Sequence, residues 1–369
     1  MTKIALTVLT DMLFGFATAF GIVLLAMPAL IKVAKIKHLV DEPSEERKLH
    51  RSSIPTIGGI LIFAGTIVAY CLWFPSKDAT AIGTNYNVLS ALDEFKYLVA
   101  CLFILFFLGL KDDITGVSPL KKLGIHLIVA FIMVVQADIR ITQFWGLFGL
   151  NEIPYWLSVG FTVFVYIVIV NAINLIDGVD GLAGGVGLIS SMGFAYWFYL
   201  TGDAPLALLA MALGGSLLGF LAFNFNPARI FMGDSGSLLI GAVLCVLAIK
   251  LIEFPKDRMP EVVEGVSKPV VAMALLAYPL VDTLRIFAYR ALQGRSPFSA
   301  DSNHIHHKLI RLRLGHKRTV IVVYLYALFM ITLTVFMPKE SPNVSFVIVG
   351  TAAILAPMVL FLIKDKLAE

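Results

Sequence analysis

Long apolar runs, separated by short polar segments, make up most of the chain. Most of these runs approach the roughly 20 residues that a helix needs to cross the hydrocarbon core of a bilayer. The pattern predicts an all-α integral membrane protein, a polytopic bundle of about 11 transmembrane helices (10–11). The predicted spans cover residues 12–34, 56–75, 95–110, 122–136, 156–173, 183–201, 206–224, 237–252, 269–292, 320–337 and 344–364.

The composition excludes several classes of protein. Of the 369 residues, 59% are hydrophobic and 15% are charged, and the mean hydropathy is +0.88. Soluble domains carry about 25% charged residues. With 29 Lys and Arg against 25 Asp and Glu, the chain also lacks the large basic excess of a nucleic-acid-binding protein. We therefore exclude a soluble enzyme, a disordered protein and a nucleic-acid binder.

The distribution of Lys and Arg predicts which loops face the cytoplasm. Segments after odd-numbered spans carry 17 of these residues, and the opposite segments carry 8. Because cytoplasmic loops are enriched in positive charge, we expect the N-terminus outside and the C-terminus in the cytoplasm. Residues 1–369 are predicted to form a single transmembrane domain. Its candidate catalytic loops, all cytoplasmic, cover about residues 35–55, 111–121, 174–182, 225–236 and 293–319.

Four polar clusters interrupt the apolar pattern, and all four follow odd-numbered spans. The topology therefore predicts that they meet at one cytoplasmic site. The clusters are Lys111-Asp112-Asp113 after span 3, Asn171, Asn174, Asp177 and Asp180 after span 5, Asp234 after span 7, and His304, His306 and His307 after span 9.

The two acidic clusters near residues 112 and 177 have the chemistry of a cation or proton-transfer site. The adjacent carboxylates Asp112 and Asp113 either end a helix in solvent or take a proton from an acidic substrate and hold a hard cation. Asn174, Asp177 and Asp180 stand three apart, on one face of a helix, among several glycines. Their oxygen atoms suit Mg²⁺ or Mn²⁺ better than zinc. The alternative is a glycine-rich connector between packed helices.

The other two clusters indicate phosphate binding. Asp234 stands in the run GDSGS just before span 8. A helix N-terminus at this place would attract phosphate, and a divalent cation would bridge the phosphate to the carboxylate. A plain helix cap is the alternative. His304, His306 and His307 lie in an Arg-rich and Lys-rich loop, which favours contact with a phosphate leaving group over a zinc site.

Span 9 contains ionisable residues of its own. Asp282 and Arg285 are three residues apart and can pair on one helix face, either as a structural pair or as part of the site. Pro279 is expected to break this helix, and Arg290 lies near its cytoplasmic end.

Together, the clusters describe a phosphoryl-transfer site at a membrane surface, in which one substrate is soluble and the other is a lipid phosphate. A membrane transporter and a membrane scaffold without catalytic activity are the rival interpretations. A transporter would more often show two related halves with broken helices, and no such symmetry is apparent in the sequence.

Four segments resemble a known family. The runs LGLKDDITGVSPLKKLGIHL, NAINLIDGVDGLAGG, NPARIFMGDSGSLLIG and GRSPFSADSNHIHHKLIRLRLGHKRTV are similar to the signature segments of the polyprenyl-phosphate N-acetylhexosamine-1-phosphate transferases, in family order. The HIHH run resembles the WecA/TagO-type branch, which moves GlcNAc-1-phosphate from UDP-GlcNAc to undecaprenyl phosphate. The alternative is the MraY branch, which moves phospho-MurNAc-pentapeptide and typically has three consecutive histidines.

The resemblance implies roles for the acidic residues. Asp112 and Asp113 match a pair that is proposed to deprotonate or position the lipid phosphate. Asp234 matches an aspartate that binds Mg²⁺, with Mn²⁺ as the alternative metal. Asn174 and Asp177 match residues near the same ion and the diphosphate.

The remaining matches imply contacts with the sugar nucleotide. Asn171 and Asp180 would lie toward the uridine. The segment RKLHRSSIPTIGG resembles a loop in which a basic residue, here Arg51, reaches the nucleotide. The residues implied to bind the diphosphate are Arg290, His304, His306 and His307.

The resemblance also implies the biological setting. The substrates would be a UDP-N-acetylhexosamine and undecaprenyl phosphate, and UMP would be released. The protein would be a multi-pass protein of the bacterial inner membrane with its active site on the cytoplasmic face. It would catalyse the first membrane step of a cell-envelope polysaccharide such as lipopolysaccharide, O-antigen or teichoic acid. Direct displacement and a two-step route through an enzyme aspartate both stay open, as does a homodimer.

Overall fold

The computed structural model describes residues 3–41, 54–75, 88–294, 304–312, 314–337 and 341–362. Among these residues the fold is helical, apart from two short antiparallel strands, β1 (Val40–Asp41) and β2 (Ile54–Pro55). The prediction of an all-α protein is therefore confirmed. The helices are α1 (Lys3–Ile36), α2 (Gly59–Trp73), α3 (Val88–Thr115), α4 (Pro119–Phe131), which continues as the π-helix η2 (Ile132–Gln136), α5 (Tyr155–Leu175), α6 (Leu182–Thr201), α7 (Ala204–Asn224), α8 (Asp234–Ile252), α9 (Lys268–Leu275), α10 (Ala277–Leu292), α11 (Ile305–Arg311), α12 (Gly315–Val335) and α13 (Pro342–Leu362), with short 3₁₀ turns at Leu147–Gly149 and Lys256–Arg258.

Each of the eleven predicted spans coincides with one helix or with the pair α9–α10. Six helices among the described residues are long and apolar enough to cross a membrane, or seven if α9 and α10 form one span. The six are α1, α4 with η2, α5, α7, α8 and α12. The polytopic character is thus supported, and the count of eleven stays a prediction.

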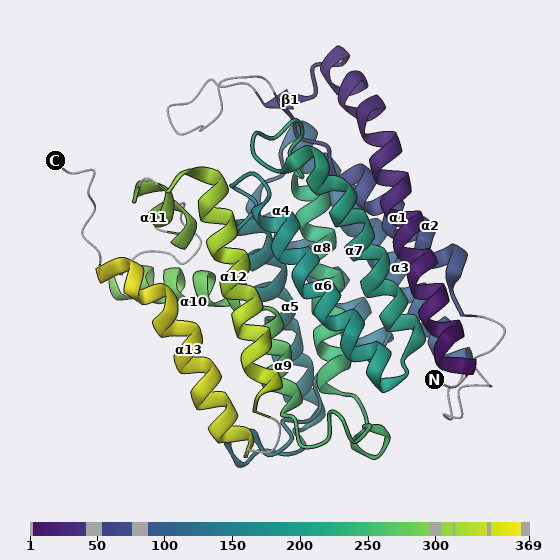
Figure 1. The fold of residues 1–369 in the computed structure, drawn as a ribbon, viewed down its shortest axis with the longest axis vertical. Helices are drawn as coiled ribbons and strands as arrows, with labels where there is room; N and C mark the ends of the chain where they lie inside the picture. Colours follow the sequence, from purple (N-terminus) through teal and green to yellow (C-terminus); the bar gives the residue numbers. More distant parts are fainter. Residues whose placement is uncertain are drawn as a thin grey trace.

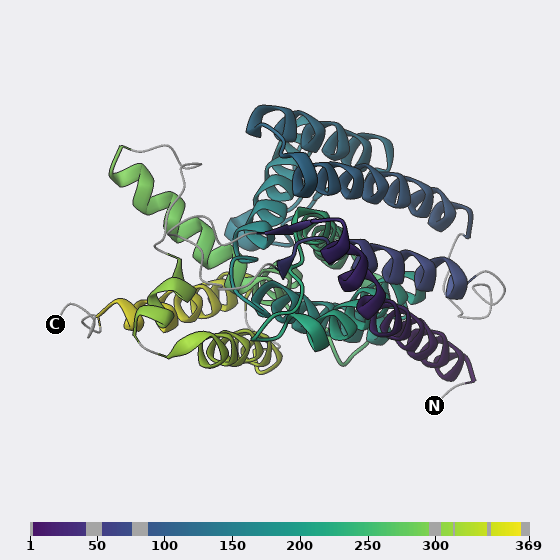
Figure 2. The same cartoon turned by 90° about the horizontal axis from the view of Figure 1, so that it is seen from above.

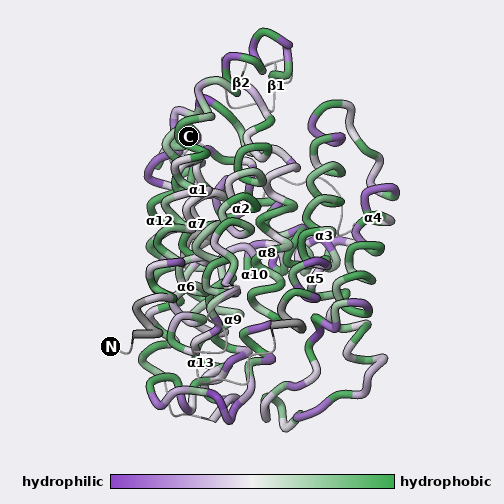
Figure 3. The backbone as a smooth tube through the Cα atoms, turned by 90° about the vertical axis from the view of Figure 1, so that its right-hand side faces the viewer, coloured by the Kyte–Doolittle hydropathy of each residue, from purple (hydrophilic) through white to green (hydrophobic). Residues whose placement is uncertain are grey.

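Helices α7 and α8 form the centre of the bundle (Figures 1 and 2). Helix α7 packs against α1, α2 and α6, and helix α8 packs against α3 and α5. Large apolar side chains such as Leu25, Trp156 and Leu325 are instead exposed on the outer helices. Along the tube in Figure 3, hydrophobic residues fill most of the helical length and hydrophilic residues gather toward the ends. This distribution fits a bundle surrounded by lipid.

The predicted span 269–292 is not one straight helix, because α9 and α10 meet at an angle of 81°. The break falls at Leu276 (φ −113°, ψ 16°), three residues before Pro279. Proline has no N–H to donate, and the first turn of a helix is the place where that loss costs least. The chain therefore restarts its helix just ahead of Pro279, and α10 runs across the bundle rather than along it (Figure 1).

Helix α11, which carries His306 and His307, lies in the upper half of Figure 1, and the helix ends that carry the acidic clusters lie at the upper end of the bundle. Helices α3, α5 and α7 end there, and α8 and α12 begin there. Helices α1 and α13 both start from the lower end and run upward. The start of α2 is also tied to this end, since the backbone N–H groups of Gly58 and Gly59 donate to the carbonyls of Phe231 and Met232, just before α8.

Candidate active site

Asp113, in the last turn of α3, caps the start of α8. Its carboxylate accepts hydrogen bonds from the backbone N–H of Asp234 (2.7 Å), the N–H of Ser235 (3.1 Å) and the Ser235 hydroxyl (2.7 Å). The first N–H groups of a helix have no partner within the helix, so this side chain from another helix supplies one. Burial raises the pKa of Asp113 to about 6. Its visible role is to fix the position of Asp234.

Gly233 makes this cap sterically feasible. Its φ of +73° lies in the left-handed region, and a Cβ there would stand 2.6 Å from both carboxylate oxygens of Asp113. Any side chain at this position would therefore displace Asp113 from the α8 terminus.

Asp112 and Asp234 share the ammonium group of Lys122. Lys122, one turn into α4, lies 3.1 Å from Asp112 Oδ2 and also donates to Asp234 Oδ2. The other oxygen of Asp112 accepts the N–H of Val117 at 2.5 Å. Sequence reasoning missed Lys122 as a site residue. The available signal was its position as the fourth residue of the helix that follows Asp112 and Asp113.

The end of α5 brings Asn174 and Asp177 to the same place. Asn174 Nδ2 donates to Asp234 Oδ1 at 2.8 Å and to the hydroxyl of Ser237 at 2.9 Å. The pKa of Asp177 is raised well above its usual range, first by burial and then by the nearby charges of Asp234 and Asp113. The three residues predicted as metal ligands, Asp234, Asn174 and Asp177, therefore come together in space.

We call this group the carboxylate cluster: Asp112, Asp113, Asp177 and Asp234 with Lys122. Its carboxylate oxygens are the donor atoms that a hard cation prefers. Two of its four carboxylates, those of Asp112 and Asp234, pair with Lys122, and Asp113 is bonded to the N-terminus of α8. Lys122 occupies the space between Asp112 and Asp234, and the Asn174 amide donates to Asp234 in this arrangement. A divalent cation that joins these oxygens must therefore compete with the lysine for Asp234.

Asp180 and Asn171 have local partners. Asp180 Oδ2 accepts from Asn226 Nδ2 (2.8 Å) and from the N–H of Ala228 (3.1 Å), and it thereby holds the loop after α7. Asn171 Nδ2 donates to the Ile167 carbonyl one turn earlier in α5. The predicted uridine contacts of both residues stay predictions. At Gly185 a Cβ would overlap the Tyr324 hydroxyl, so this glycine allows α6 and α12 to pack closely, as the alternative of a connector between packed helices predicts.

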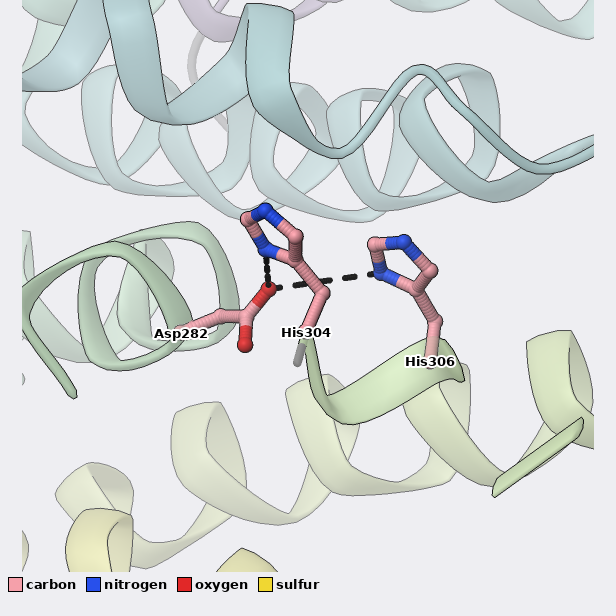
Figure 4. Close-up of side chains that lie close together, drawn as sticks. All are labelled: Asp282, His304 and His306. Atoms are coloured by element: carbon pink, nitrogen blue, oxygen red, sulfur yellow. Dashed lines mark hydrogen bonds and ion pairs between the residues drawn. The ribbon is translucent and has the colours of Figure 1, made fainter. Parts of the chain in front are cut away.

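A second cluster forms where α10 meets α11 (Figure 4). His304 Nδ1 lies 2.7 Å from Asp282 Oδ2, and the backbone N–H of Ile305 donates to Asp282 Oδ1 at 2.9 Å. Arg285 also approaches Asp282 Oδ1, at the longer distance of 3.4 Å. The predicted Asp282–Arg285 pair is thus present, but the closer partner of Asp282 is a histidine.

The other histidines complete this second group, which we call the histidine cluster: Asp282, His304, His306, His307 and Tyr278. The Tyr278 hydroxyl lies 3.2 Å from His306 Nδ1, and the His306 and His307 ring centroids are 4.5 Å apart. Burial lowers the pKa of His306 to about 3, so its ring is neutral at neutral pH. Arg290 is buried in the last turns of α10.

The structure therefore groups most of the predicted residues into two clusters at one end of the bundle. The charged neighbours that act on Asp177 belong to the carboxylate cluster, whereas those that act on His306 are the other histidines, Asp282 and Arg285. Arg51 lies outside the described residues, as do parts of the loops 35–55 and 293–319.

Comparisons with known proteins find a matching family and several relatives. Residues 95–252 match the family described as glycosyl transferase family 4. The chain is 30% identical over 335 residues to the undecaprenyl-phosphate alpha-N-acetylglucosaminyl 1-phosphate transferase of Salmonella typhi, covering 87% of this chain and 82% of that protein. It is 31% identical to the Escherichia coli K12 protein of the same name, with the same coverage. It is also 31% identical to the decaprenyl-phosphate N-acetylglucosaminephosphotransferase of Mycobacterium leprae, over 76% of this chain and 72% of the relative.

Proposed function

Because this chain belongs to the glycosyl transferase family 4 enzymes that act as polyprenyl-phosphate GlcNAc-1-phosphate transferases, we propose that it transfers GlcNAc-1-phosphate from UDP-GlcNAc to undecaprenyl phosphate. In this reaction an oxygen of the lipid phosphate forms a bond to the sugar-bearing phosphorus of the donor. The bond from that phosphorus to the bridging oxygen breaks, and UMP leaves. The products are a lipid-linked diphosphate sugar and UMP.

The convergence of Asp112, Asp177 and Asp234 at the start of α8 carries this proposal. These residues come from three helix ends that are far apart in the sequence, and they create an excess of negative charge at the end of an apolar bundle. Phosphoryl transfer depends mainly on positioning and on neutralising charge. An acidic cluster that attracts a divalent cation suits a substrate with two phosphates.

The contacts divide the roles of the two adjacent aspartates. Both oxygens of Asp113 are engaged by the N-terminus of α8, so we assign Asp113 to positioning Asp234. Asp112 faces Lys122, which can release it when substrate enters. We therefore assign to Asp112 the task of deprotonating or orienting the lipid phosphate. A two-step route through an aspartate uses the same residues.

We assign Mg²⁺ to the carboxylate cluster, held by Asp234 and Asp177 with Asn174 beside them. The donor set consists of carboxylates and an amide, without cysteine, and this combination favours Mg²⁺ or Mn²⁺ over zinc. When bound, the ion would neutralise charge on the diphosphate. The residues of the chain would orient that diphosphate, and Lys122 would balance the remaining carboxylates.

The remaining substrate contacts follow from the second cluster and the adjacent loops. We assign the diphosphate to His304, His306, His307 and Arg290, the uridine side to Asn171 and Asp180, and a nucleotide contact to Arg51. The neutral ring of His306 and the buried guanidinium of Arg290 are both hydrogen-bond donors suited to phosphate oxygens.

We further propose that the bundle crosses the bacterial inner membrane eleven times, with the N-terminus outside and the active site on the cytoplasmic side. The charge bias of the loops supports this orientation. It brings a soluble UDP-sugar from the cytoplasm and a lipid phosphate from the bilayer to one end of the helices. The product would begin the synthesis of a cell-envelope polysaccharide.

A donor comparison tests this function. Membranes that contain the chain are incubated with undecaprenyl phosphate, Mg²⁺ and labelled UDP-GlcNAc, UDP-GalNAc or UDP-MurNAc-pentapeptide. We expect label from UDP-GlcNAc to enter a lipid diphosphate, with equimolar release of UMP that stops when EDTA is added. If only UDP-MurNAc-pentapeptide served as a donor, the chain would instead be an MraY-type transferase. The absence of transfer from all three donors would refute the proposal.

A further inference from the structure

Asp282 is completely buried, and hydrogen bonds involve both of its oxygens. Oδ2 faces His304 Nδ1 at 2.7 Å, and Oδ1 accepts the Ile305 N–H at 2.9 Å. Arg285, one turn further along α10, approaches Oδ1 at 3.4 Å. The break between α9 and α10 makes this geometry possible, because it turns α10 across the bundle axis (Figure 1) and places Asp282 beside His304, just before the start of α11 (Figure 4).

The contact with Asp282 determines which nitrogen of His304 carries a proton. A carboxylate only accepts hydrogen bonds, so Nδ1 of His304 must be the donor. The other nitrogen, Nε2, then points away from Asp282 (Figure 4). An anion bound at Nε2 would therefore meet the ring on the side opposite Asp282.

His306 is oriented in a similar way by a different partner. Its Nδ1 lies 3.2 Å from the Tyr278 hydroxyl, which can donate to a neutral ring and leave the N–H on Nε2. The rings of His304 and His306 are stacked, with centroids 5.2 Å apart and planes 11° apart. Their Nε2 atoms therefore point to the same side of the cluster, away from Asp282 (Figure 4).

We propose that Asp282 is a positioning residue, which fixes the orientation of His304 so that Nε2 of His304 and Nε2 of His306 together face the diphosphate of the sugar nucleotide. This inference rests on the proposed function. It adds a residue from the middle of span 9 to a site that otherwise consists of helix ends and loops. It also gives a functional reason for a fully buried carboxylate.

A metal site is the rival interpretation of the same residues. Asp282, His304 and His306 offer ligand atoms that all lie within 4.8 Å of one another. A zinc ion at these atoms would need both Nδ1 atoms free of protons. Instead, Asp282 and His304 lie within hydrogen-bond distance of each other, and the Tyr278 hydroxyl lies next to His306 Nδ1. The guanidinium of Arg285 also lies near the Asp282 carboxylate. This arrangement favours the hydrogen-bonded interpretation.

A double-mutant cycle tests the proposal. Asp282→Asn keeps the shape of the side chain, but its single acceptor oxygen cannot serve both His304 Nδ1 and the Ile305 N–H, and its NH₂ group would face one of these donors. We expect Asp282→Asn to lower kcat/KM for UDP-GlcNAc by about 10- to 100-fold. If Asp282 acts through His304, the double variant Asp282→Asn/His304→Ala is no worse than His304→Ala alone. Effects that multiply would show that Asp282 acts independently of His304 and would overturn the proposal.

A binding measurement separates positioning from loss of structure. Asp282→Asn should weaken the binding of UDP, which has a diphosphate, and leave the binding of uridine unchanged. Equal weakening of both ligands, or no weakening of either, contradicts the proposal. If Asp282→Asn does not fold, Tyr278→Phe with and without His306→Ala tests the second half of the arrangement. There, UDP binding should fall only while His306 is present, and an unchanged UDP affinity in Tyr278→Phe contradicts the arrangement.

The controls distinguish failure of this inference from failure of the proposed function. Asp203→Asn is the matched control, since Asp203 caps α7 by accepting the Leu206 N–H at 3.2 Å and lies at the junction of α6 and α7, far from the histidines in the chain. Its activity should equal that of the wild type. A wild-type protein without transferase activity would refute the function itself. Stoichiometric zinc in the purified wild type that is lost in Asp282→Asn would overturn the positioning role in favour of a metal site.

Discussion

The two ends of the bundle use charged residues in opposite ways. At the lower end, Glu253 accepts hydrogen bonds from the N–H of Thr142 (2.7 Å), the N–H of Gln143 (3.3 Å) and the Thr142 hydroxyl. Lys268 lies over the ring of Trp145, 3.1 Å from its centroid. These contacts fasten the loop before α5 to the loop between α8 and α9, so each charge has a structural partner.

At the upper end, charge is concentrated rather than balanced. Asp112, Asp113, Asp177 and Asp234 gather there, and Lys122 pairs with two of them, Asp112 and Asp234. A polar group that serves only folding is normally matched by its neighbours, and clusters of like charge are characteristic of functional sites. The comparison teaches that, among the described residues, the close grouping of carboxylates distinguishes the candidate site more clearly than the number of polar residues does.

Removing a carboxylate from the unbalanced end should have the largest effect. We expect Asp234→Asn to lower kcat by at least about 10³-fold, because it removes charge from the oxygen donors assigned to the cation. Folding should be unaffected, since the cap on α8 uses the backbone N–H of residue 234 and not its side chain. Release of UMP and thermal unfolding are measured on the same sample. Near-wild-type turnover would remove Asp234 from the site.

The neighbouring aspartates Asp112 and Asp113 should respond differently to the same substitution. Asp112→Asn is expected to lower kcat by about 10²- to 10³-fold without changing stability, because the amide can still accept the N–H of Val117. Asp113→Asn should lower the free energy of unfolding by about 1 kcal/mol, because it weakens the cap on α8. Its kcat should fall less than that of Asp112→Asn. Equal stability of the two variants would argue against the capping role.

Lys122→Met tests whether the lysine competes with the cation. Lys122 contacts Asp234 directly, so its removal should lower the Mg²⁺ concentration at half-maximal activity by about three- to tenfold, which corresponds to about 1 kcal/mol. The value of kcat should fall at the same time, since Asp112 and Asp234 then lack their shared cation. An Mg²⁺ titration of the purified enzyme measures both quantities. A higher Mg²⁺ requirement would mean that the lysine supports cation binding instead.

Much of this architecture is predictable from the sequence because hydropathy is a local property. All eleven apolar runs correspond to helices, and the acidic and histidine-rich motifs fall at helix ends on one side of the bundle, as the alternation of spans requires. The family to which the sequence was assigned by resemblance is likewise confirmed by the comparisons.

The pairings within the site could not be predicted in the same way. Lys122 and Asp234 are 112 residues apart, and Asp113 and Ser235 are 122 apart. One sequence carries no information on which helix ends meet, so Lys122 was missed and the capping role of Asp113 was invisible. Asp282 shows the same limit at shorter range. Its contact with Arg285 can be predicted from their spacing within one helix. Its closer contact with His304 depends on the 81° bend between α9 and α10, which the sequence does not give.

The smallest effect is expected at Asp203, beside the first turn of α7. Burial raises the pKa of this capping carboxyl from 3.8 to about 6. The folded protein therefore takes up a proton as the pH falls from above 6 toward 4, and the unfolded chain does not. The contribution of Asp203 to stability consequently increases as the pH falls through this range and is least favourable at neutral pH.

Asp203→Asn should remove this pH dependence while keeping the cap, because asparagine caps helices as well as aspartate does. At pH 7.5 the variant should be as stable as the wild type or slightly more stable. Since the side chain is half-buried, solvent limits the difference to about 1 kcal/mol. At pH 5 the advantage should shrink, and transferase activity should be unchanged at both values. Thermal unfolding of both proteins at the two pH values measures the difference. If the stability advantage of Asp203→Asn over the wild type instead grew as the pH fell, the ionised carboxylate of Asp203 would be stabilised by its surroundings in the folded protein. Asp203 would then resemble Glu253, whose charge has structural partners.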